Sequence, residues 1–314
     1  MESAQTSGLH PGDPAGAGAD PLWDAPIVLA ATPIGNLGDT TDRLRALLRT
    51  AEIIACEDTR RTRHLMSALG VSTTAKLVSL HEHNEASRAA ELVEQAASGT
   101  RILVVSDAGM PAVSDPGFRL TAAAIEAGVS LTVAPGASAV TTALALSGLA
   151  TDRFTFAGFV PRKQSERMKL LERLAGEEWT TVLFESPHRI TATVSEFSQH
   201  LGAGRRAAVA RELTKKYEEV LRGSLGELAE ELTRRSSEST LRGEFVLVVG
   251  GAAPGDRSAD GQPEQVSLVE VAAVVVERAQ AGEKLKTVAK ELAAAHGLRA
   301  GEVYNAAIQQ RSQG

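Results

Sequence analysis

The first half of the chain alternates short apolar runs with longer amphipathic stretches. Residues 42–48 and 85–97 carry apolar residues at helical spacing, and Gly99 ends the second stretch. The apolar runs between such stretches are too short for helices and predict buried strands at residues 27–31, 53–56, 77–80, 102–105 and 131–133. Strands that alternate with helices indicate a parallel sheet with both faces covered.

A second set of elements follows the turn Ala134-Pro135-Gly136 and a small apolar helix predicted over residues 137–147. Helices fit residues 165–174, 190–201 and 225–234. Strands fit residues 154–157, 181–184, 207–210, 217–221 and 245–249, and their close spacing indicates a mixed sheet. The predicted fold class is therefore α/β, with two lobes joined near residues 149–152 and a cleft between them, where ligands commonly bind.

The composition changes at both ends of the chain. Residues 1–24 are rich in Gly, Ala, Pro and Asp, which predicts a disordered tail. The lobes are expected at residues 25–150 and 151–250, followed by a linker over 251–265. Residues 266–314 predict a small helical domain, in which Ser267 and Glu270 form a capping box. Its last helix has few basic residues, which favours a docking bundle over a DNA-reading unit.

Composition and charge narrow the class of protein. No apolar stretch among the 314 residues is long enough to span a bilayer, and the first basic residue is Arg43, so we expect a cytoplasmic protein without a leader. Cys56 is the only cysteine, which excludes an intrachain disulfide. A net charge of −6 argues against a purely electrostatic nucleic-acid binder. However, six basic and two acidic residues lie between Arg153 and Arg173, and such a stripe can bind a phosphate backbone.

Polar segments follow the predicted strands, but neither familiar nucleotide-binding motif is among them. The chain has no G-x-G-x-x-G after the first strand and no P-loop motif. "ATPIGNLGDTT" (31–41) fits an ordinary strand–turn–helix connection, with Asp39 or Thr40 as the cap. In "ACEDTRRTRHLM" (55–66), a cluster of three arginines follows Glu57 and Asp58. That cluster suits either a bound phosphate or carboxylate, or a solvated face with ion pairs.

The segments after the third and fourth strands are the strongest candidates for a ligand site. In "SLHEHNE" (79–85), His81 and His83 share one side of an extended chain, but the sequence lacks H-E-x-x-H, so polar lining is favoured over a metal site. In "SDAGMPAVSDPG" (106–117), Asp107 can accept hydrogen bonds from sugar hydroxyls and Gly109 allows close approach of the backbone. Ser114 and Asp115 are interpreted mainly as shaping this loop. Contact with a ligand is favoured over a purely structural role.

Two segments of the second half place carboxylates beside basic groups. Glu185 is followed by His188 and Arg189 in "FESPHRI", and Glu212 lies near Lys215 in "VARELTKKYEE". Each pair could support proton transfer, or could be an ordinary ion pair.

Taken together, these segments resemble one known family. "TPIGNLGDTT", "ACEDTRRT", "LHEHNE", "SDAGMPAVSDPG", "PGASA", "DRFTFAGFVPRK", "FESPHR", "ARELTKKYEE" and "GEFVLVV" occur in the order found in the bacterial small-subunit ribosomal RNA ribose 2′-O-methyltransferase I family, a branch of the tetrapyrrole-methylase superfamily. The resemblance runs from about residue 27 to residue 249.

The resemblance implies a fold, a reaction and a set of contacts. It implies S-adenosylmethionine (the cofactor) in a cleft between two α/β lobes, a homodimer, and methylation of the 2′-hydroxyl of a cytidine in the decoding region of small-subunit ribosomal RNA. Met110 departs from the threonine of the family pattern, which a backbone contact would tolerate. The implied cofactor contacts are Ile34, Gly35, Asp107, Ala108, Gly109, Met110, Ser138, Ala139, Phe184, Ala210, Arg211 and Leu213.

The implied reaction needs no metal, but a ribose hydroxyl is a weak nucleophile and benefits from a proton acceptor. The candidates for this catalytic role are Glu57, Asp58, His81, Glu185 and Glu212. Candidates for binding RNA phosphates are Arg60, Arg162, Lys163 and Lys215. Two alternatives remain open: a sister methyltransferase that acts on a small molecule such as a corrin precursor, and a non-catalytic RNA-binding assembly factor.

Overall fold

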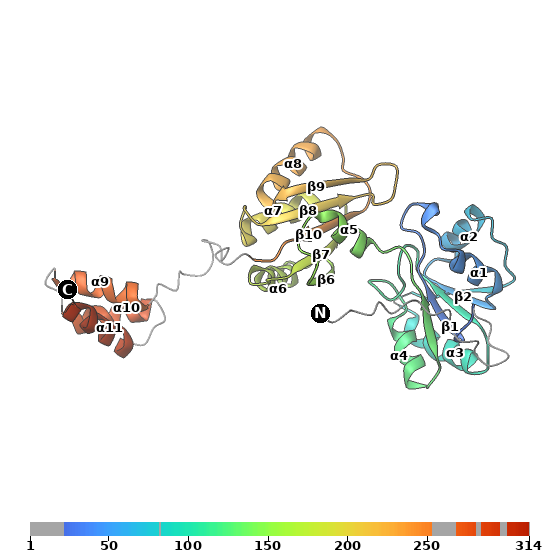
Figure 1. Ribbon diagram of the computed structural model, residues 1–314, viewed down its shortest axis with the longest axis horizontal. Helices are drawn as coiled ribbons and strands as arrows, with labels where there is room; N and C mark the ends of the chain where they lie inside the picture. The colour runs from blue at the N-terminus through green and yellow to red at the C-terminus, as the bar shows by residue number, and fades with distance from the viewer. Residues whose placement is uncertain (1–21, 82, 253–267, 281–283, 296–299, 314) are drawn as a thin grey trace, which may run out of the picture.

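Two α/β lobes and a helical bundle follow one another along the chain (Figure 1). The computed structural model describes residues 22–81, 83–252, 268–280, 284–295 and 300–313. Most of the predicted tail, most of the predicted linker and the predicted cap at Ser267 lie outside the described residues.

The first lobe is built on a parallel sheet with the strand order β3-β2-β4-β1-β5. Because β4 lies between β1 and β2, the loop after β4 meets the loop after β1, and Thr32 and Gly109 exchange two backbone hydrogen bonds of 2.9 and 3.1 Å. The strands are β1 (Ile27–Ala30), β2 (Ile53–Cys56), β3 (Lys76–Ser79), β4 (Ile102–Val105) and β5 (Leu131–Ala134).

Helices cover both faces of this sheet, as the apolar runs predicted. The 3-10 turn η1 (Leu37–Asp39) precedes the helices α1 (Asp42–Thr50), α2 (Thr59–Ala68), α3 (Glu85–Ala97) and α4 (Phe118–Glu126). Apolar residues of α1 and α2 pack in one core layer, and those of α3 and α4 pack in the other. Trp23 is buried in the first layer, and its Nε1 donates to Thr50 Oγ1 at 2.9 Å. The folded lobe therefore includes Trp23, inside the segment that composition assigned to a tail.

The second lobe is the mixed sheet that the close strand spacing predicted. Its order is β6-β7-β10-β8-β9, with β6 parallel to β7 and the other neighbours antiparallel. Its strands are β6 (Phe154–Phe159), β7 (Thr180–Glu185), β8 (Arg206–Arg211), β9 (Glu219–Ser224) and β10 (Phe245–Val249).

Helices also cover both faces of the second sheet. The helices α6 (Gln164–Ala175), α7 (Ile190–Leu201) and α8 (Leu225–Glu238) share a core on one face. The other face is covered by α5 (Ala139–Ser147), whose buried residues pack on β7, β8 and β10. This helix packs on the second sheet although it precedes the lobe boundary expected near residue 150, and so it ties the two lobes together.

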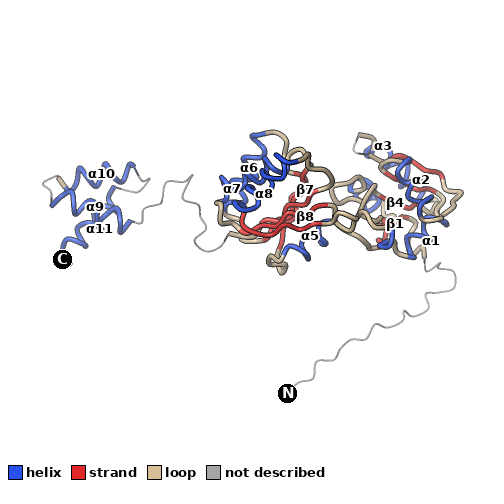
Figure 2. Tube along the Cα trace, turned by 90° about the horizontal axis from the view of Figure 1, so that it is seen from above, coloured by secondary structure: helices blue, strands red, loops and turns tan. Residues whose placement is uncertain are grey.

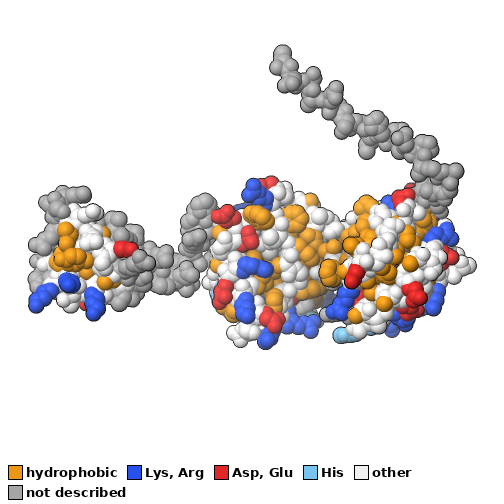
Figure 3. Space-filling view, turned by 90° about the horizontal axis from the view of Figure 1, so that it is seen from below, with side chains coloured by type: hydrophobic (Ala, Val, Ile, Leu, Met, Phe, Trp, Pro, Cys, Tyr) orange, Lys and Arg blue, Asp and Glu red, His pale blue; other side chains and the backbone are white. Residues whose placement is uncertain are grey.

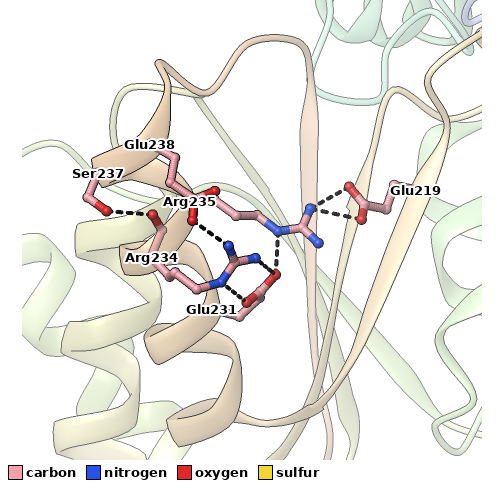
Figure 4. Close-up of polar contacts among 6 residues, drawn as sticks. All are labelled: Glu219, Glu231, Arg234, Arg235, Ser237 and Glu238. Atoms are coloured by element: carbon pink, nitrogen blue, oxygen red, sulfur yellow. Dashed lines mark hydrogen bonds and ion pairs between the residues drawn. The ribbon is translucent and has the colours of Figure 1, made fainter.

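An ion-pair network fastens α8 to the edge strand β9 (Figure 4). The Arg235 guanidinium donates to both carboxylate oxygens of Glu219, at 2.7 and 2.8 Å, and to Glu231 at 2.6 Å. Nη1 of Arg235 binds both oxygens of Glu219 and its Nε binds Glu231, so one guanidinium joins β9 to α8. The network helps hold β9 at the end of the second sheet.

The carboxyl-terminal bundle consists of α9 (Leu268–Gln280), α10 (Leu285–Ala295) and α11 (Ala300–Gln313), which pack against one another (Figure 2). Val271, Val275, Val288 and Val303 are among the residues of its separate apolar core. The helices predicted for this part of the chain are thus present as a small bundle. In the described residues, none of the helices is long and apolar enough to cross a membrane.

Candidate active site

A cavity of about 410 Å³ lies between the two lobes. The loops after β1, β2 and β4 contribute to the lining from the first lobe, and the ends of β6 and β7, residues 243–246 and the start of α5, which packs on the second sheet, complete it. The facing sides of the lobes carry many hydrophobic side chains (Figure 3). The volume and the mixed apolar and polar lining are typical of a small-molecule site.

The loop after β4 is pressed against the loop after β1. Gly109 has a φ of +84°, and a Cβ atom there would lie 3.3 Å from Cγ2 of Ile34. Ala112 and Ser114 also have left-handed backbone conformations, with φ of 67° and 62°. Such conformations cost energy in residues with a side chain and concentrate at functional sites. These contacts and conformations fix the shape of the loop, and its polar residues line the cavity.

Asp107 fastens this loop to the start of α2. One carboxylate oxygen accepts a hydrogen bond from the backbone N–H of Asp58 at 3.1 Å, and the other lies 3.2 Å from Nη1 of Arg61. The carboxylate also lines the cavity. Asp107 therefore both organises the loop and offers acceptor oxygens to a bound molecule.

Three of the residues with carboxyl groups that line the cavity, Glu57, Asp107 and Asp115, belong to the first lobe. Burial, followed by the charge of Glu57, raises the pKa of Asp115 to about 7. Burial and the charge of Asp107 also raise the pKa of Glu57 above its ordinary value. Near neutral pH, Asp115 holds its proton for part of the time, which lessens the repulsion on an ionised Glu57.

The pKa of Asp115 leads to a stability prediction for Asp115→Asn. An unfolded aspartate ionises near pH 4, so between about pH 4 and pH 7 the folded protein holds a proton that the unfolded chain has lost. Asp115 therefore makes the protein less stable as the pH rises through that window. We expect thermal denaturation to show that the variant gains stability relative to the wild type between pH 5 and pH 8. A difference in stability between the variant and the wild type that does not change with pH would contradict a raised pKa for the buried Asp115 carboxyl.

The opposite wall of the cavity is aromatic. The ring of Phe184 lies edge-to-face between two other rings, with centroid distances of 4.9 Å to Phe156 and 5.4 Å to Phe159. Ser138 and Ala139 place the amino-terminal end of α5 at the lining, and Ala139 packs against the same apolar core as Phe184. The site therefore combines carboxylates, a helix start and a cluster of phenylalanines.

Eight of the twelve residues predicted to contact a cofactor line the cavity. They are Ile34, Asp107, Ala108, Gly109, Met110, Ser138, Ala139 and Phe184. The side chain of Lys215 covers Gly35, because a Cβ atom at Gly35 would collide with it. Ala210 and Leu213 are buried beneath α5, and Arg211 donates to the carbonyl of Arg242 at 2.8 Å. The family motifs predicted these four residues as cofactor contacts, but the structure does not place them in the lining of the cavity.

The structure separates the five predicted proton acceptors into two groups. Glu57 and Glu185 line the cavity, whereas Asp58, His81 and Glu212 do not. Asp58 accepts from the backbone N–H of Arg60 at 2.8 Å and pairs with its side chain, and these bonds lower the pKa of Asp58. Asp58 is therefore the cap of α2.

The carboxylates of the second lobe are held by their own neighbours. Glu185, whose side chain is 1% exposed, accepts from Thr193 Oγ1 and from the backbone of Ser186, both at 2.7 Å, and lies 3.3 Å from Nη2 of Arg189. Burial alone would raise the pKa of Glu212. The hydrogen bond from Lys215 outweighs this effect, so the pKa of Glu212 is lowered. Glu57 thus remains the candidate that both lines the cavity and has a raised pKa.

The predicted phosphate-binding residues differ in how free they are. Arg162 and Lys163 are exposed, and so is Arg60 although it pairs with Asp58, whereas Lys215 is held between Glu212 and Glu244 at 2.8 and 3.0 Å. Exposed cations can reach an RNA backbone, and a lysine that already binds two carboxylates is less available. No group of three His, Cys, Asp or Glu side chains suited to a metal ion occurs in the described part of the chain.

Comparison with known proteins decides the family. Residues 26–229 match the family of Tetrapyrrole (Corrin/Porphyrin) Methylases. Ribosomal RNA small subunit methyltransferase I of Mycobacterium tuberculosis (strain ATCC 25618 / H37Rv) is 46% identical over 91% of this chain and 96% of its own length. The chain belongs to the ribosomal RNA small subunit methyltransferase I family. The protein of that name from Halalkalibacterium halodurans is 41% identical over 89% of this chain and 93% of its own length.

Experimental structures of more distant relatives confirm the two-lobed fold. A diphthine synthase structure has a TM-score of 0.53 and 16% identity, covering 72% of this chain and 90% of its own. A cobalt precorrin-4 methyltransferase structure has a TM-score of 0.51 and 16% identity, covering 71% and 93%. At these identities the likeness establishes the fold alone, so the α/β class predicted from the strand pattern is confirmed.

Asp115 and Phe159 are among the lining residues that were not predicted as site residues. Asp115 belongs to the second Ser-Asp pair of the 106–117 loop. Because this pair repeats the first one, which contains Asp107, the sequence could have indicated a second site residue here. Phe159 stands one strand length beyond Phe154 in an aromatic run, where nothing in the sequence distinguishes a core ring from an exposed one. Both positions depend on how the two lobes face each other.

Proposed function

We propose that this protein transfers a methyl group from S-adenosylmethionine to the ribose 2′-hydroxyl of a cytidine in the decoding region of small-subunit ribosomal RNA. The observation that carries the proposal is 46% identity, over nine-tenths of both chains, to a protein named for methylation of small-subunit ribosomal RNA. The carboxylate-lined cavity between the lobes supports it, because a cavity of about 410 Å³ suits a small cofactor.

The lining fits S-adenosylmethionine in size and chemistry. The backbone at Gly109 can approach a ligand closely, and Asp107 offers acceptor oxygens for ribose hydroxyls. The apolar surface around Ile34 and Phe184 suits an adenine ring. When bound, the cofactor supplies an electrophilic methyl group on a sulfonium sulfur.

Glu57 is proposed as the group that accepts the hydroxyl proton. Its carboxylate lines the cavity, and its raised pKa brings its basicity closer to neutrality. Asp115, by holding a proton up to about pH 7, allows Glu57 to stay ionised beside it. Transfer would break the methyl–sulfur bond and leave its electron pair on a neutral thioether, while the ribose oxygen would bond to the methyl carbon and its proton would move to Glu57.

The exposed cations around the site are proposed to hold the RNA backbone. Arg60 lies at the start of α2, and Arg162 and Lys163 follow β6.

A homodimer, which the family resemblance implies, is also proposed, and light scattering of the purified protein tests it. A ribosomal substrate further implies a cytoplasmic location.

Transfer of labelled methyl groups tests the proposed function. We expect label to enter the ribosomal RNA of small subunits lacking the modification, and not a corrin or porphyrin precursor. Label that enters only the tetrapyrrole would establish the sister small-molecule activity. Calorimetry that detects no binding of S-adenosylmethionine would favour a non-catalytic assembly factor.

A further inference from the structure

The ring of Phe159 is at the mouth of the cavity and is mostly exposed. It lines the cavity, yet the residue is 62% exposed. Phe154, at the other end of the same strand, is 38% exposed and is not part of the lining. Exposing a large aromatic ring is unfavourable in the free protein, and exposed apolar groups beside a ligand site commonly mark contact with a partner molecule.

A bulge in β6 directs Phe159 to this position. The register between β6 and β7 shifts between Phe156 and Phe159, and Gly158 has a φ of +70°. Bulges of this kind re-aim the following side chain. A Cβ atom at Gly158 would lie 3.6 Å from the hydroxyl of Ser114, so the bulge reaches the 106–117 loop of the other lobe. Phe159 therefore stands where the two lobes meet at the cavity.

Phe184 contacts the ring of Phe159, which is otherwise largely exposed to solvent. Phe184 contacts it edge-to-face at 5.4 Å with an interplanar angle of 67°, and Phe156 braces Phe184 in turn at 4.9 Å. Such contacts fix the orientation of a ring, and Phe159 still remains 62% exposed. The arrangement gives a rigid aromatic surface rather than a mobile side chain.

Exposed cations follow this ring along the chain. Arg162 and Lys163 come three and four residues after Phe159, and both are exposed. Lys163 makes an ion pair with Glu166 at 3.4 Å, and its side chain is largely in solvent, so this contact is weak. An aromatic surface beside flexible cations is the combination that binds unpaired nucleotides, through base stacking and phosphate contacts.

We propose that Phe159 stacks on the base of the nucleotide whose ribose enters the cavity. The inference rests on the proposed function. A ribose hydroxyl reaches an enclosed site only when its nucleotide leaves the regular stack, and an aromatic ring replaces the lost stacking. Phe159 then positions the substrate but makes no contribution to the basicity of Glu57.

Steady-state methylation of small ribosomal subunits by Phe159 variants tests this role. Phe159→Leu keeps an apolar side chain and removes the ring, and we expect its KM for the subunit to rise about tenfold. Phe159→Tyr keeps the ring and should stay near the wild-type KM. Phe154→Ala is the matched control on the same strand. The affinity for S-adenosylmethionine, measured by calorimetry, should stay unchanged in all three variants.

Each outcome separates the stacking role from the proposed function. If the wild type methylates subunits and Phe159→Leu has the wild-type KM, the stacking role is excluded. It is also excluded if Phe159→Tyr behaves like Phe159→Leu, or if the cofactor affinity falls together with activity. If the wild type itself methylates no ribosomal RNA, the proposed function fails, independently of Phe159.

Discussion

Glu57→Gln is expected to lower the single-turnover rate of methyl transfer by about two to four orders of magnitude, the usual effect of losing a general base. Glutamine keeps the size of the side chain but cannot take the hydroxyl proton. Among the four carboxylates and one histidine that the sequence offered, Glu57 lines the cavity with a raised pKa, and Glu185 is held by three donors of its own lobe.

The dependence of this rate on pH adds a second readout. Because burial and Asp107 raise the pKa of Glu57, the wild-type rate should fall on acidification at a pH above the ordinary range of a glutamate. Asp58→Asn is the matched control, since an asparagine side chain would retain the cap of α2 and this position does not line the cavity. Equal rates for Glu57→Gln and the wild type would exclude Glu57 as the acceptor.

Asp107→Ala is expected to weaken the binding of S-adenosylmethionine about a hundredfold, in the range for loss of hydrogen bonds to a charged group. The substitution removes acceptor oxygens from the cavity, and it also releases the backbone of Asp58 and the side chain of Arg61. Isothermal titration calorimetry measures the change directly.

Asp115→Ala is the matched comparison within the same loop. Asp115 is protonated for part of the time near neutral pH, and it makes no ion pair comparable to that of Asp107 with Arg61 among the contacts of the described residues. Its loss should therefore weaken cofactor binding less than the loss of Asp107. Equal or reversed losses would show that the second half of the loop holds the cofactor.

The strand pattern predicted the fold because most of its strands are buried on both faces. Every residue of β1, β2 and β4 is buried, so these strands appear in the sequence as uninterrupted apolar runs. The place of α5 could not be predicted in this way. Its residues are small and apolar on all sides, and such a helix fits either sheet equally well.

The loop after β4 was identified from its residues, but the full lining of the cavity was not. Asp107 and Gly109 follow a buried strand with the polarity and freedom that a ligand loop needs. Ala210 and Leu213 match the family motif in sequence, yet the packing of α5 buries them. Phe159 reaches the cavity through a strand bulge, and Asp115 through left-handed residues beside it, and neither feature has a signal in residue type alone.

Mapping 2′-O-methylation along small-subunit ribosomal RNA tests the central claim most directly. RNA from cells with and without this gene is compared nucleotide by nucleotide, and a plasmid copy restores the gene. The proposed function predicts that one ribose methylation, on a cytidine of the decoding region, disappears without the gene and returns with the plasmid, but does not return with a copy carrying Glu57→Gln. An unchanged methylation map in cells without the gene would contradict it.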